Sequence, residues 1–164
     1  MRIKVTLLLI TLTTSLHMFA QRHYFVSFSV KEGLAQSQVR DIKQTSDGYL
    51  WIATVGGISR FDGQEFVTYN KSNGLPNNLA TSLLESSSNE LWAACKGNVV
   101  IFNHDVNRTL ALPKAFEEVV GNDLAEYNGS IYMASNGVGL LKIKGESVDV
   151  IDFGDDEMNF ARAL

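Results

Sequence analysis

The sequence is poor in the residues that build redox and zinc sites, with one cysteine and three histidines among 164 residues. A single thiol, Cys95, excludes a disulfide within the chain and a cysteine-rich metal site. The histidines His17, His23 and His104 are scattered and do not have the spacing of zinc ligands. We therefore expect no metal and no cofactor.

Signals for several functional classes are also missing. The formal net charge is −4, so no basic surface for nucleic acid is expected. The chain lacks a phosphate-binding glycine loop, a nucleophile elbow and a kinase signature. The content of 45% hydrophobic and 20% charged residues is typical of a globular protein. The composition indicates a folded domain, and no catalytic residues can be assigned.

Residues 1–20 resemble a secretory signal peptide. Arg2 and Lys4 give a positive start, Val5 to Leu16 is mostly apolar, and Ala20 provides a small residue before Gln21. The apolar run is shorter than the ~20 residues of a membrane span. We expect a cleaved signal and a periplasmic or otherwise extracytoplasmic mature chain, and a retained anchor is the alternative.

The remainder of the chain is organised by an internal repeat of about 41 residues. Four pairs of landmarks lie 41 positions apart, namely Trp51 and Trp92, Phe61 and Phe102, Gly33-Leu34 and Gly74-Leu75, and Phe25 and Phe66. Self-similarity at a fixed period is the signature of repeat architectures, including propellers.

The first complete unit predicts four short antiparallel strands. Runs of apolar and β-branched residues alternate with the turn dipeptides Asp47-Gly48, Gly56-Gly57 and Asp62-Gly63. The predicted strands cover residues 39–44, 49–54, 58–61 and 65–69. Four strands in about 40 residues fit one blade of a β-propeller. The predicted fold class is therefore all-β, made of four-stranded antiparallel propeller blades.

The repeat divides residues 21–164 into parts of a propeller. We predict a closing strand at 24–30, blades at 33–70, 74–112 and 116–152, and the start of a fourth blade at 159–164. Closed propellers need about four to eight blades. The sequence therefore predicts an incomplete ring of three blades plus an N-terminal closing strand, in a fragment of a longer protein.

Residues that recur in each unit have two readings. Trp51, Trp92 and Tyr132 could stack on a sugar, but a large side chain at one fixed place in each blade is expected to pack blade against blade. The small residues Thr54, Cys95 and Ser135 also share one position. A nucleophilic Cys95 would need a nearby base, so we expect a small buried side chain there.

Candidate sites outside the repeated positions are weak. An acidic run near the C-terminus fits no calcium loop and is expected to be a solvated loop; it consists of Asp149, Asp152, Asp155, Asp156 and Glu157. Loops 30–38, 70–78 and 114–122 differ most between units, so they are the first choice for a functional face. The ligand-binding residues stay unknown.

Four segments together resemble the two-component regulator propeller repeat. They are Gly33-Leu34-Ala35-Gln36-Ser37-Gln38-Val39, Asp47-Gly48-Tyr49-Leu50-Trp51-Ile52-Ala53-Thr54, Gly57-Ile58-Ser59-Arg60-Phe61-Asp62-Gly63 and Phe66-Val67-Thr68-Tyr69. The Ser46-Asp47-Gly48 turn is also similar to the aspartate box of sialidases, where the aspartate caps a turn. In the third unit Tyr132 replaces the tryptophan, and the resemblance weakens.

The resemblance implies a sensor. Repeats of this family form extracytoplasmic propellers ahead of a membrane helix and a cytoplasmic histidine kinase, and many members are taken to sense carbohydrates. The resemblance implies a small-molecule or carbohydrate ligand. It also implies that the chain is partnered by the remainder of its own sensor protein, which would form a homodimer. The alternatives are a fragment of a secreted propeller hydrolase or lyase, and a stand-alone interaction propeller.

Overall fold

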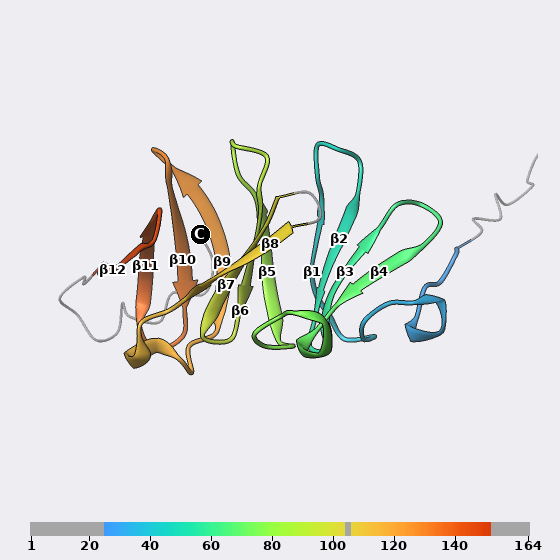
Figure 1. Ribbon diagram of the computed structural model, residues 1–164, viewed down its shortest axis with the longest axis horizontal. Helices are drawn as coiled ribbons and strands as arrows, with labels where there is room; N and C mark the ends of the chain where they lie inside the picture. The colour runs from blue at the N-terminus through green and yellow to red at the C-terminus, as the bar shows by residue number, and fades with distance from the viewer. Residues whose placement is uncertain (1–24, 104–105, 152–164) are drawn as a thin grey trace, which may run out of the picture.

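Three four-stranded antiparallel sheets stand side by side in chain order (Figure 1). The computed structural model of the protein describes residues 25–103 and 106–151. Blade 1 contains β1 (Val39–Gln44), β2 (Leu50–Thr54), β3 (Gly57–Phe61) and β4 (Phe66–Tyr69). Blade 2 contains β5 (Ala80–Glu85), β6 (Leu91–Cys95), β7 (Asn98–Asn103) and β8 (Val106–Ala111). Blade 3 contains β9 (Gly121–Tyr127), β10 (Ser130–Ser135), β11 (Gly139–Lys144) and β12 (Ser147–Ile151).

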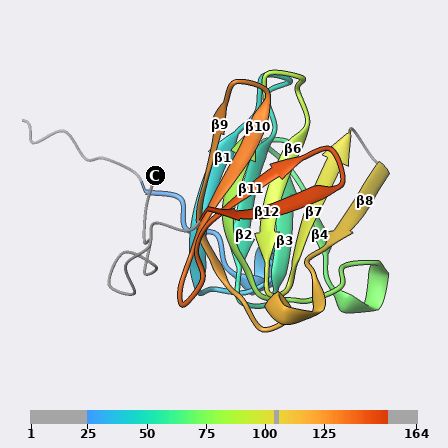
Figure 2. The same ribbon diagram turned by 90° about the vertical axis from the view of Figure 1, so that its left-hand side faces the viewer.

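Each blade is a meander whose strands pair in sequence order. The first strand of each blade contacts the first strand of the next, β1 with β5 and β5 with β9. Figure 2 views the row from the side of blade 3 and shows the sheets one behind another. The predicted all-β fold of propeller blades is confirmed, and each blade 1 strand begins and ends within one residue of its prediction.

One irregularity recurs in every blade. The pairing of the first two strands shifts register between Val39 and Asp41 in blade 1, and between Ala80 and Ser82 in blade 2. In blade 3, Ser135 pairs with Gly121 while Ala134 pairs with Asp123, which gives the same shift. A β-bulge inserts one unpaired residue and increases the local twist. The bulge is therefore a feature of the repeat.

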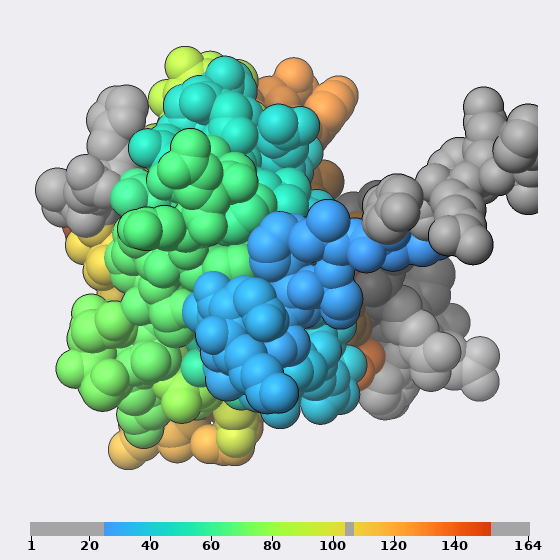
Figure 3. Space-filling model, turned by 90° about the vertical axis from the view of Figure 1, so that its right-hand side faces the viewer, coloured from blue at the N-terminus to red at the C-terminus, as the bar shows by residue number. Residues whose placement is uncertain are grey.

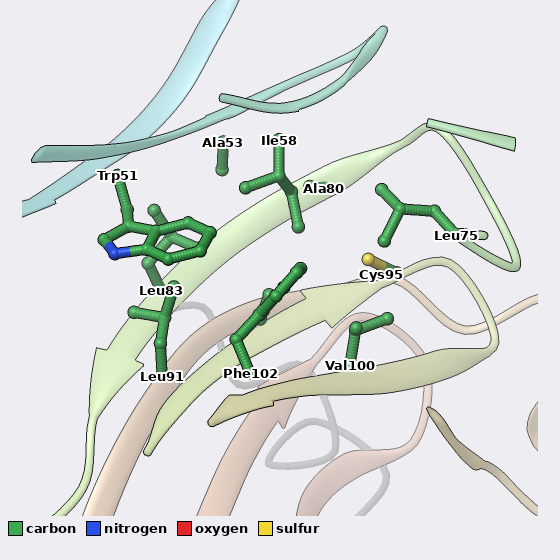
Figure 4. Close-up of a cluster of buried hydrophobic side chains, with 11 residues drawn as sticks. Trp51, Ala53, Ile58, Leu75, Ala80, Leu83, Leu91, Cys95, Val100 and Phe102 are labelled. Carbon is green, nitrogen blue, oxygen red and sulfur yellow. The ribbon is translucent and has the colours of Figure 1, made fainter. Parts of the chain in front are cut away.

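The core lies between blades. The first buried cluster joins blade 1 side chains such as Trp51 and Ile58 to blade 2 side chains such as Leu83, Leu91 and Phe102 (Figure 4). A second cluster joins the opposite side of blade 2 to blade 3. In each pair, strand alternation directs one face of a sheet to the preceding blade and the other to the following blade. We name these the near face and the far face.

The N-terminal segment differs from its prediction. The expected strand at 24–30 is not seen over residues 25–30. Residues 25–29 have no regular structure, and a 3-10 turn, η1, covers Val30–Glu32. A strand needs a neighbour to accept its backbone hydrogen bonds, and none is paired with this segment among the described residues. Ring closure by this segment stays a prediction.

Connections between blades carry short turns. The 3-10 turns η2 (Lys71–Asn73) and η3 (Lys114–Phe116) precede blades 2 and 3. In η1 and η2 a side chain, Ser29 or Asn70, caps the turn, and Gly33 or Gly74 ends it with a positive φ of 110° or 116°. Glycine adopts this backbone region without steric cost. Both capping boxes stand 41 residues apart and so belong to the repeat.

Two predicted segments, the signal at 1–20 and the blade start at 159–164, lie outside the described residues. Within residues 25–103 and 106–151, no helix has the length and apolar character that crossing a membrane requires.

Candidate functional site

A cleft of about 300 Å³ opens between blade 1 and blade 2. It lies at the end of the blades that carries the β1–β2 and β5–β6 turns, at the top of Figure 1. The lining comes from both blades and consists of Thr45, Ser46, Asp47, Tyr49, Trp51, Arg60, Glu85, Asn89, Leu91 and Phe102. This volume is at the lower end of the range for small-molecule pockets.

The β1–β2 turn forms one wall of the cleft. Asp47 Oδ1 accepts hydrogen bonds from Thr45 Oγ1 at 2.6 Å and from the Tyr49 amide at 3.4 Å. The Gly48 amide donates to the Thr45 carbonyl at 2.9 Å, and Gly48 has a φ of 93°. The carboxylate therefore organises the turn, which confirms the capping role expected for Asp47.

Arg60 supplies the positive charge of the cleft. Its guanidinium carbon lies 4.6 Å from the centre of the Tyr49 ring and 5.7 Å from that of Trp51. These distances are within the range of cation–π attraction. The two carboxylates of the lining, Asp47 and Glu85, make the cleft electrostatically mixed. Such a site suits a polar ligand with both donors and acceptors.

Glu85 ties the two walls together. Its Oε1 accepts hydrogen bonds from the amide and the hydroxyl of Ser46, at 2.8 and 2.6 Å. Glu126 in blade 3 holds Ser87 in blade 2 with both of its oxygens, Oε2 accepting from the amide and Oε1 from the hydroxyl, each at 2.6 Å. These bonds lower the pKa of Glu126, the Ser87 side chain first and its backbone amide second. The carboxylates act as staples between blades.

The tryptophans do not offer a stacking platform. Trp51 is 4% exposed, and its ring lies 4.9 Å from that of Phe102 in blade 2 and 5.8 Å from that of Tyr69. Trp92 is also buried, in the cluster between blades 2 and 3. Both therefore pack blade against blade, as expected. Tyr132 takes the same position in blade 3 and is half-buried.

The second recurring position is also structural. Thr54, Cys95 and Ser135 are fully buried, each paired with the residue that precedes the bulge of its blade. The hydroxyls of Thr54 and Ser135 donate to the carbonyls of Gly57 and Gly139. Burial raises the pKa of the Cys95 thiol to about 12. Its thiol stays protonated at neutral pH, which argues against a nucleophile and confirms the small buried residue.

The three variable loops lie at the opposite end of the blades from the cleft. Segments 70–78 and 114–122 run along the lower edge of Figure 1, and 30–38 leads into β1 from the same edge. The Gly97 amide donates to the Val119 carbonyl at 2.9 Å, which attaches the third loop to blade 2. The structure gathers these loops on one face, and a binding role for them stays a prediction.

The remaining candidates form no site in the part of the chain that the structure describes. Asp149 is exposed on β12, while the other four acidic residues of its run lie outside the described residues, as do all three histidines. No group of three potential metal ligands occurs within residues 25–103 and 106–151.

Sequence reasoning missed the roles of Arg60, Glu85 and Glu126. Glu85 and Glu126 are 41 residues apart, as are Ser46 and Ser87. This recurrence of polar residues was the available signal, because a polar side chain that returns at the repeat period indicates a contact that the repeat needs.

Known proteins share both the sequence motif and the fold. Residues 33–56 match the model of the two-component regulator propeller. A histidine kinase, P4 of Formosa agariphila, is 48% identical over 42 residues, which are 26% of this chain and 3% of that protein. The chain thus matches only a small part of this relative.

Solved structures show the same architecture. The extracellular domain of BT4673 from B. thetaiotaomicron, described as a hybrid two-component system, has a TM-score of 0.67 at 17% identity over 84% of this chain and 20% of its own. The corresponding domain of BT3049 gives 0.62 at 21% identity over 75% of this chain and 18% of its own. Virginiamycin B lyase from Staphylococcus aureus gives 0.65 at 13% identity, over 81% of this chain and 46% of its own.

The last two proteins combine one fold with different functions, so likeness of fold carries no activity. The family motif is more specific, because it coincides with the turn that Asp47 organises and with the strand that carries Trp51. Residues 33–56, which carry β1 and β2 of the first of the three blades, are accordingly a repeat of the two-component regulator propeller family.

Proposed function

We propose that this chain is the extracytoplasmic, ligand-sensing propeller segment of a two-component sensor, without catalytic activity of its own. The proposal is supported by the family repeat at residues 33–56 and by the likeness to extracellular domains of two-component systems. The observation that carries ligand sensing is the cleft between blades 1 and 2, whose two walls come from different blades.

A ligand in this cleft would act on the relative position of two blades. Asp47, Tyr49 and Arg60 belong to blade 1, while Glu85, Asn89 and Leu91 belong to blade 2. A ligand shifts an equilibrium only by its differential affinity for the two states. A molecule that contacts both walls therefore favours one arrangement of the two blades. The transmitter would lie in the remainder of the sensor protein, which would act as a homodimer.

The proposed ligand is a small polar molecule, with a carbohydrate as the first choice. The cleft combines a guanidinium, two carboxylates and an amide with the half-exposed ring of Tyr49. Hydroxyl groups of a sugar can both donate to the carboxylates and accept from Arg60. Trp51 lines the cleft but is only 4% exposed, because its ring stacks on Tyr69 and packs against Phe102, so it offers little surface to a ligand.

The test uses Arg60→Gln with Arg108→Gln as its matched control. Arg108 also lies over a tryptophan, 5.9 Å from the Trp92 ring, but it is not part of the cleft lining. The purified chain is titrated by calorimetry with a panel of neutral and acidic mono- and disaccharides. We expect at least one sugar to bind, with binding lost in Arg60→Gln and retained in Arg108→Gln. Absence of binding across the panel, or equal loss in both variants, would contradict the site.

A further inference from the structure

The repeat separates the residues that line the cleft between blades 1 and 2 into two kinds. Residues of the first kind have a counterpart of the same type 41 positions away, in a neighbouring blade. The pairs are Ser46 with Ser87, Trp51 with Trp92, Glu85 with Glu126, Leu91 with Leu50, and Phe102 with Phe61. Trp51 on the far face of blade 1 and Phe102 on the near face of blade 2 belong to the core between the blades. These residues recur because the repeat needs them to hold its blades together.

Residues of the second kind differ from their counterparts. The residues 41 positions from Asp47, Tyr49, Arg60 and Asn89 are Ser88, Glu90, Ile101 and Gly48. Asp47 caps its own turn, so its presence has a structural reason. We call the other three, Tyr49, Arg60 and Asn89, the cleft-specific residues. Tyr49 and Arg60 belong to blade 1, and Asn89 belongs to blade 2.

Asn89 has a left-handed backbone in the turn between β5 and β6, with a φ of 60°. The same turn of blade 1 has Gly48 at this position, with a φ of 93°. Both turns close alike, because the amides of Gly48 and Asn89 donate to the carbonyls of Thr45 and Ser86, each at 2.9 Å. A side chain is uncommon in this backbone region, although asparagine tolerates it better than most residues. The turn itself therefore does not require asparagine.

The side chain of Asn89 makes no hydrogen bond within residues 25–103 and 106–151, and the residue is exposed. Its turn is held instead by the Ser86 hydroxyl, which accepts from the Glu90 amide at 3.2 Å. In the loop 70–78, by contrast, each asparagine accepts a hydrogen bond from a backbone amide; they are Asn70, Asn73, Asn77 and Asn78. The amide group of Asn89 is thus available to a molecule in the cleft that it lines.

The two turns that border the cleft stand at one edge of the molecule. Figure 3 views the row from the side of blade 1 and shows the β1–β2 turn in cyan and the β5–β6 turn in yellow-green together at the top. The bonds from Ser46 to Glu85 join the first turn to the strand that leads into the second. Asn89 therefore belongs to a turn whose position relative to blade 1 is fixed.

We propose that Asn89 is the residue of blade 2 that determines ligand specificity, with its side-chain amide hydrogen-bonded to hydroxyl groups of a sugar. This inference rests on the function proposed above for the same cleft. The amide offers both donors and an acceptor, as adjacent hydroxyl groups require. Tyr49 and Arg60 contact the same sugar from blade 1, so the ligand lies between the cleft-specific residues of two blades.

The first experiment repeats the calorimetric titrations of the full chain with the same panel of mono- and disaccharides. Asn89→Gly introduces the residue found in blade 1, and Asn89→Asp keeps the size of the side chain but removes its donors. We expect a sugar that binds the unaltered chain to bind both variants about tenfold more weakly, which corresponds to the loss of one hydrogen bond. Asn128→Gly is the matched control, because Asn128 also has a positive φ, of 48°, and does not line the cleft. It should bind like the unaltered chain.

Two further measurements distinguish a binding role from a structural one. Asn89→Gly relieves the left-handed strain but increases the entropy of the unfolded chain, so its melting temperature without sugar should stay close to that of the unaltered chain. The unaltered chain should also bind one deoxy analogue of the sugar more weakly than the sugar itself. Asn89→Gly should discriminate less between these two molecules, because the partner of the missing hydroxyl is gone.

Three results would overturn this inference while the proposed function stands. The first is binding that both Asn89 variants retain and Arg60→Gln loses. The second is an equal loss of binding in Asn128→Gly. The third is a melting temperature of Asn89→Gly clearly below that of the unaltered chain, since Asn89 would then serve the turn. Absence of binding to the unaltered chain across the panel would contradict the proposed function itself, and this inference with it.

Discussion

Glu85 and Ser46 stand 39 residues apart and are joined by two hydrogen bonds between neighbouring blades. Glu126 and Ser87 repeat this arrangement one blade further along. In each case the carboxylate at the end of a first strand accepts from the amide and the hydroxyl of the preceding blade's first turn. The apolar clusters hold the middle of the blades together, and these staples fix their turn-bearing ends.

The first prediction concerns the staple at the cleft. Glu85→Ala removes the oxygen that accepts both hydrogen bonds from Ser46. Because both bonds are exposed, the free energy of unfolding should fall by about 1 kcal/mol, the net contribution of a typical hydrogen bond. Glu85→Gln keeps an oxygen acceptor, so its free energy of unfolding should fall by less. Urea denaturation followed by tryptophan fluorescence measures both. Glu65→Ala, in an exposed turn, is the control, and an equal loss in all three variants would contradict the staple.

The strands and the blade interfaces could be predicted from the sequence because their signals are local. The turn glycines and the alternation around Trp51 specify four strands and a packed face without knowledge of the neighbours. Phe25, Val26 and Phe28 look like a strand by composition, but residues 25–29 have no regular structure, and the closing role expected for this segment stays a prediction. Strand formation also depends on a partner for the backbone, which composition does not reveal.

The cleft could not be predicted for a related reason. Arg60 and Glu85 are ordinary surface residues in the sequence, and only the lateral contact of two blades brings them to one opening. A repeat predicts which residues face a neighbour, but the shape left between two neighbours depends on their twist. The aspartate turn was predictable because Asp47 and the amide it accepts from are two residues apart.

The second prediction tests whether Trp51 stabilises the fold through its contact with blade 2, by comparing it with Tyr132 at the equivalent position of blade 3. Trp51→Ala should cost about 3–5 kcal/mol of unfolding free energy, the usual range for removing a buried large aromatic side chain. Tyr132→Ala at the equivalent position of blade 3 should cost roughly 1 kcal/mol, because that side chain is half-exposed. Thermal unfolding followed by circular dichroism, at a concentration where the chain is monomeric, compares them. Equal losses would show that Trp51 does not contribute through its contact with blade 2.

The third prediction uses two glycines that both have a positive φ. A Cβ added at Gly97, φ 71°, would lie 2.2 Å from the Glu117 carbonyl oxygen, whereas one added at Gly48, φ 93°, would meet nothing within 4 Å. Gly48→Ala should therefore cost about 1 kcal/mol through backbone strain alone. Gly97→Ala adds a steric clash with the loop before blade 3 and should lower the melting temperature clearly more. The pair is compared by differential scanning fluorimetry, and similar melting temperatures would contradict the close approach.

The last prediction follows from the pKa of Glu126. The Ser87 hydroxyl and amide lower this pKa from its usual 4.5, so the native state favours the carboxylate more than the unfolded chain does. The stabilisation is therefore complete above about pH 4.5 and is lost as the pH falls through the lowered pKa. Glu126→Gln lacks this titration. The melting temperature of the unaltered chain should exceed that of the variant at pH 7, and the difference should shrink steadily below pH 4.5.

Glu32 and Asp62 also have lowered pKa values, caused by hydrogen bonds from Ser29 and from the amides of Glu65 and Gln64. Both groups titrate in the unaltered chain and in the variant, so their effect cancels in the difference between the two melting temperatures. A difference that stays constant down to acid pH would show that the Ser87 bonds do not depend on the charge of Glu126.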